Sequence, residues 1–262
     1  MSGRWPLLPP RADTIRHRLI VALDVETRAE AEALVAALRS EVGVFKVGKQ
    51  LFLNSGPEVV RMIHHHGGDV FLDLKFHDIP HTVARAGVEA ARLGVRFFDL
   101  HASGSFDMME RTHAEVGRAC RREGLRRPKI LAVTVLTSLG KGDLRRVGVT
   151  GAVEGQVVRL ARLARKAGMD GVVASPLEIA RIRRECGRGF LIVTPGVRPP
   201  TAPHDDQKRV TTPGDAMRAG ADYLVVGRPI RDAADPLAVV REVVADMARG
   251  FLAGRTRPGP RA

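Results

Sequence analysis

This sequence is poor in the residues that several classes of protein require. It holds two cysteines in 262 residues, Cys120 and Cys186, which argues against a disulfide scaffold and favours a reducing, cytoplasmic setting. No apolar run approaches the roughly 20 residues that cross a bilayer, and residues 1–13 lack the apolar centre of a secretory signal. Aromatic residues make up 4% of the chain, so side chains that could stack on nucleic-acid bases are scarce.

Basic side chains, by contrast, are abundant, and the formal net charge is +13. A charge of this size raises the hypothesis of a polyanion partner. The arginines are nevertheless scattered over separate segments, near residues 121–127, 181–184 and 255–261. We therefore interpret most of them as solvated helix faces and a few as ligands for an anionic small molecule. No specific nucleic-acid partner and no membrane partner is expected.

Strand-like and helix-like segments alternate along the chain. The expected strands are 18–24, 44–48, 69–76, 97–101, 129–136, 171–174, 190–193 and 222–227. The helix expected after each strand covers 27–39, 57–66, 80–93, 105–122, 153–167, 176–186, 213–219 and 236–247.

Eight such units in a chain of this length predict an α/β fold, a single (β/α)₈ or TIM barrel. The strands are rich in Val, Ile, Leu and Ala, as expected when both faces of a parallel sheet are covered. An open doubly wound sheet is the alternative, but no GxGxxG motif follows the first strand. The barrel is expected to span 16–250, with a flexible N-terminal segment at 1–15 and a basic flexible tail at 251–262.

The third strand carries an unusual row of charges. Within Asp69–Phe76, Asp73 and Lys75 are two residues apart and would share one side of the strand, and Asp78 follows where the chain should turn. An ordinary surface ion pair could explain two of these residues. Unpaired ions are costly to bury, however, and alternating signs within an otherwise aliphatic strand indicate a functional array.

Other polar residues also fall at the ends of the expected strands, where barrels of this kind place their reactive groups. With Asp73, Lys75 and Asp78, the set comprises the polar residues Asp24, Lys46, His101, Thr137, Ser138, Arg198 and Arg228, and Gly227 directly precedes Arg228. The last two strands usually form a phosphate site, so Gly227, Arg228 and Arg198 are candidate phosphate ligands. The long loop at 199–212 is a candidate lid. Three consecutive histidines, His64–His66, cannot face one metal ion, because each helical step turns the side chain by about 100°.

Six segments together resemble the orotidine 5′-phosphate decarboxylase family. They are Ile20–Asp24, Lys46–Gly48, Asp73–Pro80, Val135–Ser138, Thr194–Pro199 and Val226–Ile230, in the family's order and across nearly the whole barrel. One departure is His81, where many members have Asn.

The resemblance implies a barrel of the ribulose-phosphate-binding type that converts orotidine 5′-phosphate to UMP and CO₂, without cofactor or metal, as the last step of de novo pyrimidine nucleotide synthesis. It implies a homodimer in which Asp78 is contributed across the interface, and Lys75 as the proton donor to C6. The implied catalytic residues are Lys46, Asp73, Lys75 and Asp78. The implied substrate-binding residues are Asp24, Lys46, Asp73, Thr82, Thr137, Arg198, Gln207, Gly227 and Arg228.

Two alternatives remain at this point. Related sugar-phosphate barrels, a keto-gulonate-phosphate decarboxylase or a hexulose-phosphate synthase, share the Asp-x-Lys-x-x-Asp spacing but require a divalent ion. The continuation Ile79–Thr82 favours the nucleotide enzyme. A polyanion-binding barrel with a vestigial site would account for the net charge of +13 but not for the charged row.

Overall fold

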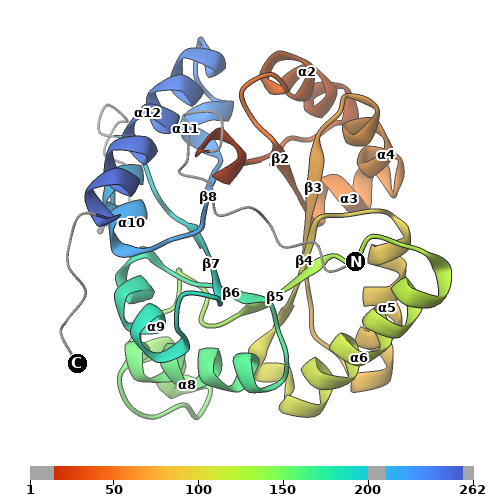
Figure 1. The fold of residues 1–262 in the computed structure, drawn as a ribbon, viewed down its shortest axis with the longest axis vertical. Coiled ribbons are helices and arrows are strands. Elements are labelled where there is room, and N and C mark those ends of the chain that lie inside the picture. The colour runs from red at the N-terminus through yellow and green to blue at the C-terminus, as the bar shows by residue number, and fades with distance from the viewer. Residues whose placement is uncertain (1–14, 200–210, 256–262) are drawn as a thin grey trace.

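The computed structural model describes residues 15–199 and 211–255, and within them eight parallel strands close into a barrel (Figure 1). Each strand pairs with the next, and β1 pairs with β8, so the open-sheet alternative is wrong and the barrel prediction is confirmed. The strands are β1 (Leu19–Ala22), β2 (Val44–Gly48), β3 (Asp69–Phe76), β4 (Phe97–His101), β5 (Lys129–Val133), β6 (Gly171–Val173), β7 (Leu191–Pro195) and β8 (Tyr223–Val226).

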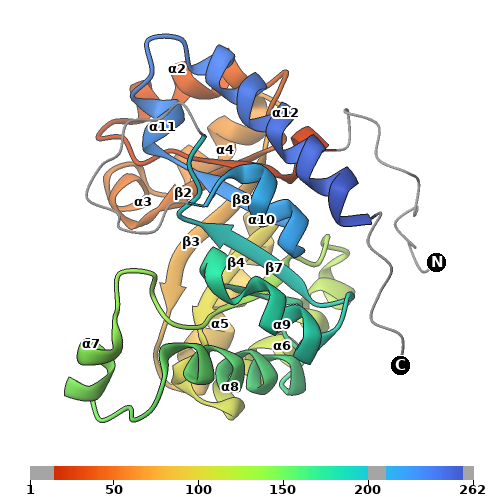
Figure 2. The ribbon, with the colours of Figure 1, turned by 90° about the vertical axis from the view of Figure 1, so that its left-hand side faces the viewer.

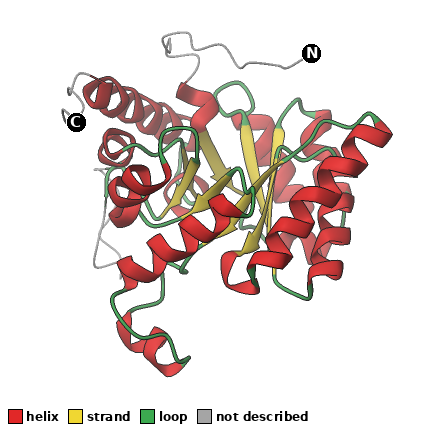
Figure 3. Cartoon of the chain, turned by 60° about the horizontal axis from the view of Figure 1, so that its bottom comes forward, coloured by secondary structure: helices red, strands yellow, loops and turns green. Residues whose placement is uncertain are grey.

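Helices surround the strands as an outer layer (Figure 3). They are α2 (Arg28–Leu38), α3 (Lys49–Ser55), α4 (Glu58–His65), α5 (Pro80–Arg92), α6 (Phe106–Glu123), α7 (Lys141–Arg146), α8 (Val153–Lys166), α9 (Ile179–Cys186), α10 (Pro213–Ala219), α11 (Arg228–Arg231) and α12 (Pro236–Arg255). Sequence periodicity missed α3, α7 and α11, because helices of four to seven residues are too short to show a repeating apolar face. None of the described helices is long and apolar enough to cross a membrane.

Local signals explain where several helices begin and end. Thr27 and Glu30 form a reciprocal capping box at the start of α2. Pro80 begins α5, where its missing N–H costs nothing. Gly124 ends α6 in the left-handed conformation that glycine adopts without strain. The signals at Thr27 and Pro80 place the starts of α2 and α5 shortly after the ends of β1 and β3, and that rim carries the candidate site.

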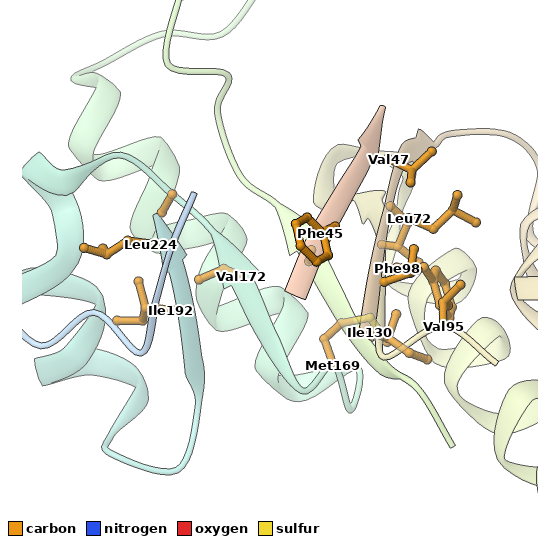
Figure 4. Close-up of a cluster of buried hydrophobic side chains, with 14 of the residues drawn as sticks. Phe45, Val47, Leu72, Val95, Phe98, Ile130, Met169, Val172, Ile192 and Leu224 are labelled. Carbon is orange, nitrogen blue, oxygen red and sulfur yellow. The ribbon is translucent and has the colours of Figure 1, made fainter. Parts of the chain in front are cut away.

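Alternate residues of each strand face opposite sides, which divides the core in two. Residues such as Phe45, Leu72, Phe98 and Val172 face outward and join the large cluster under the helices (Figure 4). A smaller cluster fills the barrel interior, made of Ile20, Ala22, Val44, Phe71, Phe97, Leu131, Val193 and Val225. This interior layer is the apolar floor beneath the charged residues described below.

Two expected boundaries require correction. Ile15 was expected in the flexible N-terminal segment, yet it is 2% exposed and belongs to the core. The C-terminal tail was expected from residue 251, but α12 continues to Arg255. Residues 1–14 and 256–262, and with them the remainder of both expected tails, lie outside the described residues.

The segment between β5 and α8 projects from the barrel. Figure 2 shows α7 standing away from the ring of helices at the end of a long connection. Val147, just after α7, is 73% exposed.

Candidate active site

Four charged side chains from the first three strands meet inside the barrel, directly above its apolar floor. Asp24 follows β1, Lys46 lies on β2, and Asp73 and Lys75 lie on β3. Lys46 Nζ lies 2.9 Å from Asp24 Oδ1 and 3.2 Å from Asp73 Oδ2. Lys75 Nζ contacts the other oxygen of Asp73. The result is a continuous row, carboxylate–ammonium–carboxylate–ammonium, which we call the charged row.

The centre of the charged row is largely withdrawn from water, since Lys46 is 8% exposed and Asp73 is 9% exposed. Burial by itself lowers the pKa of Lys46, but attraction to Asp73 and Asp24 outweighs it and holds that pKa above its usual value. Burial likewise favours the neutral form of Asp73, yet Lys46, then a side-chain hydrogen bond with Asp99 of β4, and then Lys75 keep the pKa of that carboxyl below its usual value. Both groups are therefore charged at neutral pH.

Lys75 reaches Asp73 through a local distortion of β3. Leu72 pairs with Phe98 of β4, whereas Phe76 pairs with Leu100, so β3 holds two more residues than β4 over this stretch. Lys75 lies within this bulge with φ of 52°, a left-handed conformation that costs a non-glycine residue on the order of 1–3 kcal/mol. The predicted sharing of one side by Asp73 and Lys75 thus depends on a bulge and not on regular strand alternation.

Asp99, on β4, joins this group and was missed by the sequence reasoning. It is fully buried, and its Oδ1 accepts a hydrogen bond of 2.8 Å from the backbone N–H of Lys75. Burial and then the negative charge of Asp73 raise the pKa of Asp99 well above its usual value. Strand alternation could have found it, because Phe97, Asp99 and His101 point to one side and Phe97 lies in the barrel interior.

A cavity opens beside the charged row. One side presents Lys46, Asp73 and Lys75, and much of the rest is apolar, from Phe71, Val133, Val135, Val173 and Val225. Thr137 and Leu136, from the connection after β5, line it as well. A flat ligand with one charged substituent fits this division between polar and apolar walls.

Glycines keep the rim open near Asp24. A Cβ added to Gly48 would lie 3.2 Å from Asp24 Oδ1 and 3.3 Å from Lys46 Nζ. A Cβ on Gly227 would lie 3.8 Å from Asp24 Oδ2. Gly48 was quoted in the resemblance but given no role, and its position shows that it leaves space for the Lys46–Asp24 pair.

Several predicted residues are not part of the charged row. Asp78 and Thr82 are exposed around the start of α5, and Asp78 Oδ1 accepts a 2.6 Å hydrogen bond from Ile79 N. No ion pair joins Asp78 to the row within the described part of the chain. Arg198 is 7% exposed, with its N–H bonded to Thr211 O at 3.2 Å, while Arg228 is exposed at the start of α11. Gln207 and residues 200–210 of the predicted lid lie outside the described residues.

The histidines have structural surroundings. His64 lies within hydrogen-bonding distance of Gly68 O and Leu93 O, at 3.1 and 3.3 Å. His101 lies at the end of β4 with its ring 5.2 Å from that of His77. Burial, aided by His77 and by Lys75, lowers the pKa of His101 to about 4, so this side chain is neutral at physiological pH.

Comparison with known proteins identifies relatives along almost the whole chain. Residues 17–243 match the family described as "Orotidine 5′-phosphate decarboxylase / HUMPS family". Proteins named orotidine 5′-phosphate decarboxylase from Syntrophotalea carbinolica and Geobacter sulfurreducens are each 56% identical over 91% of this chain, which covers 98% and 99% of those proteins.

Solved structures agree with these sequence relatives. Orotidine 5′-phosphate decarboxylase from Lactobacillus acidophilus superimposes with a TM-score of 0.78 at 36% identity, over 88% of this chain and 99% of that one. An uncharacterized protein from Geobacillus kaustophilus gives a TM-score of 0.77 at 35% identity, over 87% and 99% of the two chains. This chain belongs to the orotidine 5′-phosphate decarboxylase / HUMPS family.

Proposed function

We propose that this protein decarboxylates orotidine 5′-phosphate to UMP and CO₂, the last step of de novo pyrimidine nucleotide synthesis. The observation that carries the proposal is the charged row, whose members Lys46, Asp73 and Lys75 line a largely apolar cavity. The family membership and the names of the 56% identical relatives support the same reaction.

The chemistry requires a cation beside the reacting carbon. When the bond between C6 and the carboxylate breaks, its electron pair stays on C6, and CO₂ leaves. The ammonium of Lys75 stabilises that charge in a site with little water and then donates a proton to C6. The resulting neutral amine regains its proton from solvent, so neither cofactor nor metal takes part in the proposed step.

Asp73 has two effects in this scheme. It holds Lys75 and Lys46 from opposite oxygens, which orients both ammonium groups before substrate arrives. It also places a negative charge near the carboxylate that must depart, which disfavours the bound ground state. The two carboxylates and two ammonium groups of the charged row have a net charge of zero, which lowers the free-energy cost of burying them before substrate binds.

The remaining predicted residues are proposed to hold the nucleotide. Asp24 and Lys46 are 2.9 Å apart and Lys46 lines the cavity, so this pair is proposed to bind ribose hydroxyl groups. Thr137 lines the cavity, and Thr82 is proposed to reach the nucleotide from α5. The proposed phosphate ligands are Arg198, Gln207, Gly227 and Arg228. Phosphate binding away from C6 would supply the energy that brings the carboxylate next to Asp73.

We also infer a homodimer in which Asp78 completes the site of the partner subunit. Its support is that Asp78 is exposed and separate from the charged row of its own chain, beside Ile79, which is 66% exposed. A cytoplasmic location is part of the same proposal, supported by two buried free thiols, Cys120 and Cys186. Mixing inactive Lys75→Ala and Asp78→Ala chains should restore activity through hybrid dimers, and no recovery would contradict a shared site.

The reaction is tested by following the loss of orotate absorbance when purified enzyme, treated with chelator, meets orotidine 5′-phosphate. Turnover by the wild type and its loss in Lys75→Ala are expected, because no other described ammonium group contacts Asp73 from that side. Full activity of Lys75→Ala would contradict the proposed proton donor. Metal-dependent turnover of a pentulose or hexulose phosphate instead would identify the protein as one of the sugar-phosphate enzymes.

A further inference from the structure

Asp99 has no part in the scheme above, yet it lies directly against it. Its side chain is fully buried on the inward side of β4. One oxygen is bonded to Lys75 N at 2.8 Å. The other, Oδ2, is buried and accepts no bond from an N–H or O–H group among the described residues. A side-chain hydrogen bond between the Asp99 and Asp73 carboxyls helps to raise the pKa of Asp99 and to lower that of Asp73, so a protonated Asp99 donates to Asp73. A carboxyl that is fully buried beside another carboxyl is expensive to keep in a protein core, which calls for a functional reason.

The bond to Lys75 compensates for a gap in the sheet. Regular pairing between β3 and β4 stops at Leu72 and resumes at Phe76, so the residues in between lack the usual ladder. The N–H of Lys75 falls in this gap and is turned by the left-handed backbone at φ of 52°. Asp99 Oδ1 supplies the acceptor that a β4 carbonyl would otherwise offer. Without this acceptor, the Lys75 N–H would lose its hydrogen bond, and no bond would offset the energetic cost of the left-handed Lys75 backbone.

We propose that Asp99 is a positioning residue, which holds the Lys75 backbone in its left-handed conformation and so directs the ammonium group to Asp73 and the cavity. This inference rests on the proposed function, because it assigns Asp99 to the same reaction. Asp99 needs no contact with substrate: it acts through the Lys75 main chain.

A neutral Asp99 carboxyl suits this positioning role better than an ionised one. An ionised Asp99 would add a second negative charge beside Asp73 and would draw the Lys75 ammonium away from the cavity. Burial and the nearby Asp73 charge both favour the protonated form. A neutral asparagine can therefore replace Asp99, since its amide oxygen can accept the same bond from Lys75 N. A leucine of similar shape cannot.

The test compares Asp99→Leu, Asp99→Ala and Asp99→Asn with wild type and with Thr112→Val, a control for loss of a buried hydrogen bond on the outer helix α6. Thr112 is fully buried and bonds to Met108 O at 2.7 Å. We expect kcat to fall about 100-fold in Asp99→Leu and Asp99→Ala, as for a small misplacement of a reacting group, with KM within a few-fold of wild type. Asp99→Asn should stay within about tenfold of wild type, because only the acceptor is required. Thr112→Val should keep its kcat.

Crystal structures of the wild type and of Asp99→Leu and Asp99→Asn supply a readout that needs no substrate. Lys75 should keep its positive φ and its contact with Asp73 in the asparagine variant and lose them in the leucine variant. Unchanged Lys75 geometry in Asp99→Leu, or equal loss of kcat in the asparagine and leucine variants, would overturn the inference. If wild type fails to turn over orotidine 5′-phosphate, the proposed function falls, while the crystal structures still decide whether Asp99 positions Lys75. If the leucine variant does not fold, Asp99→Ala takes its place in both measurements.

Discussion

Replacing Asp73 by asparagine tests the electrostatic account of the site most directly. Asp73 is 9% exposed and neutralises two ammonium groups, one on each oxygen. The substitution keeps the size and one acceptor oxygen but removes the charge. Lys46 retains Asp24 at 2.9 Å, whereas Lys75 loses the only carboxylate that is described in ion-pair contact with it. One partly buried cation is then left without a counter-charge.

The size of the effect follows from the burial of the partners. Removing one member of a buried ion pair costs about 3–5 kcal/mol. The Lys75 side chain is 26% exposed, so water offsets part of the loss. Asp99, freed from the repulsion of Asp73, can ionise more readily and offsets a further part. We therefore expect the free energy of unfolding to fall by about 3 kcal/mol, at the low end of that range.

Urea unfolding followed by circular dichroism, at one protein concentration and pH 7, measures this change. The matched control is Asp69→Asn, on the same strand, where Asp69 also faces two cations, Arg96 at 3.0 Å and Arg126 at 3.1 Å. The Arg126 side chain is 60% exposed, whereas that of Arg96 is 12% exposed. The Asp69 side chain is more open to water than that of Asp73, at 26% against 11% exposed. This control should therefore lose less than Asp73→Asn, about 2 kcal/mol, and should keep full turnover.

The double variant Asp73→Asn/Lys75→Met completes the experiment. Removing both charges leaves no unpaired cation, so its stability should return to within about 1 kcal/mol of wild type, although activity is abolished. A loss below 1 kcal/mol in Asp73→Asn, or a double variant less stable than Asp73→Asn, would refute the argument that opposite charges hold the row together.

The remaining predictions concern the rim of the cavity. Gly48→Ala places a Cβ about 3.2 Å from Asp24 Oδ1 and should raise KM several-fold by separating the Lys46–Asp24 pair, whereas Gly155→Ala, whose Cβ meets open space, should leave KM unchanged. Arg228→Ala should raise KM for the nucleotide by about 10-fold or more, the value of a charge-assisted hydrogen bond, with no change in Tm; an unchanged KM would remove Arg228 from the phosphate site. His101 has a pKa of about 4 in the folded protein and about 6.5 when unfolded. The unfolded chain therefore binds more protons between these values, so stability should rise as pH increases from about 4 to 6.5. His101→Gln should flatten that rise in denaturation measured across the pH range; an equally steep rise in the variant would show that His101 is not its source.

Much of the barrel could be predicted from the order of segments. The eight strands were located by their apolar runs. Two of them end more than one residue before the predicted end: β1 ends at Ala22 instead of Asp24, and β5 ends at Val133 instead of Leu136. Parallel strands carry their C-terminal ends to one rim. Asp24, Lys46, Asp73 and Lys75 could therefore be assigned to one place without knowledge of any distance.

The short helices and the bulge were not predictable in this way. Helices α3, α7 and α11 have too few turns to show amphipathic periodicity. The bulge at Lys75 is a mismatch between β3 and β4, so it is a property of two strands and leaves no mark on either alone.

The sequence by itself determined the fold class, the family and which charged residues stand near the ends of the strands, because hydrophobic periodicity and motif spacing are local properties. Tertiary structure alone decided that Lys75 adopts a left-handed backbone, that Asp99 accepts a hydrogen bond from the Lys75 N–H, and that Asp78 lies apart from the charged row of its own chain. These features depend on strand register and on burial, which arise only when distant segments pack against one another.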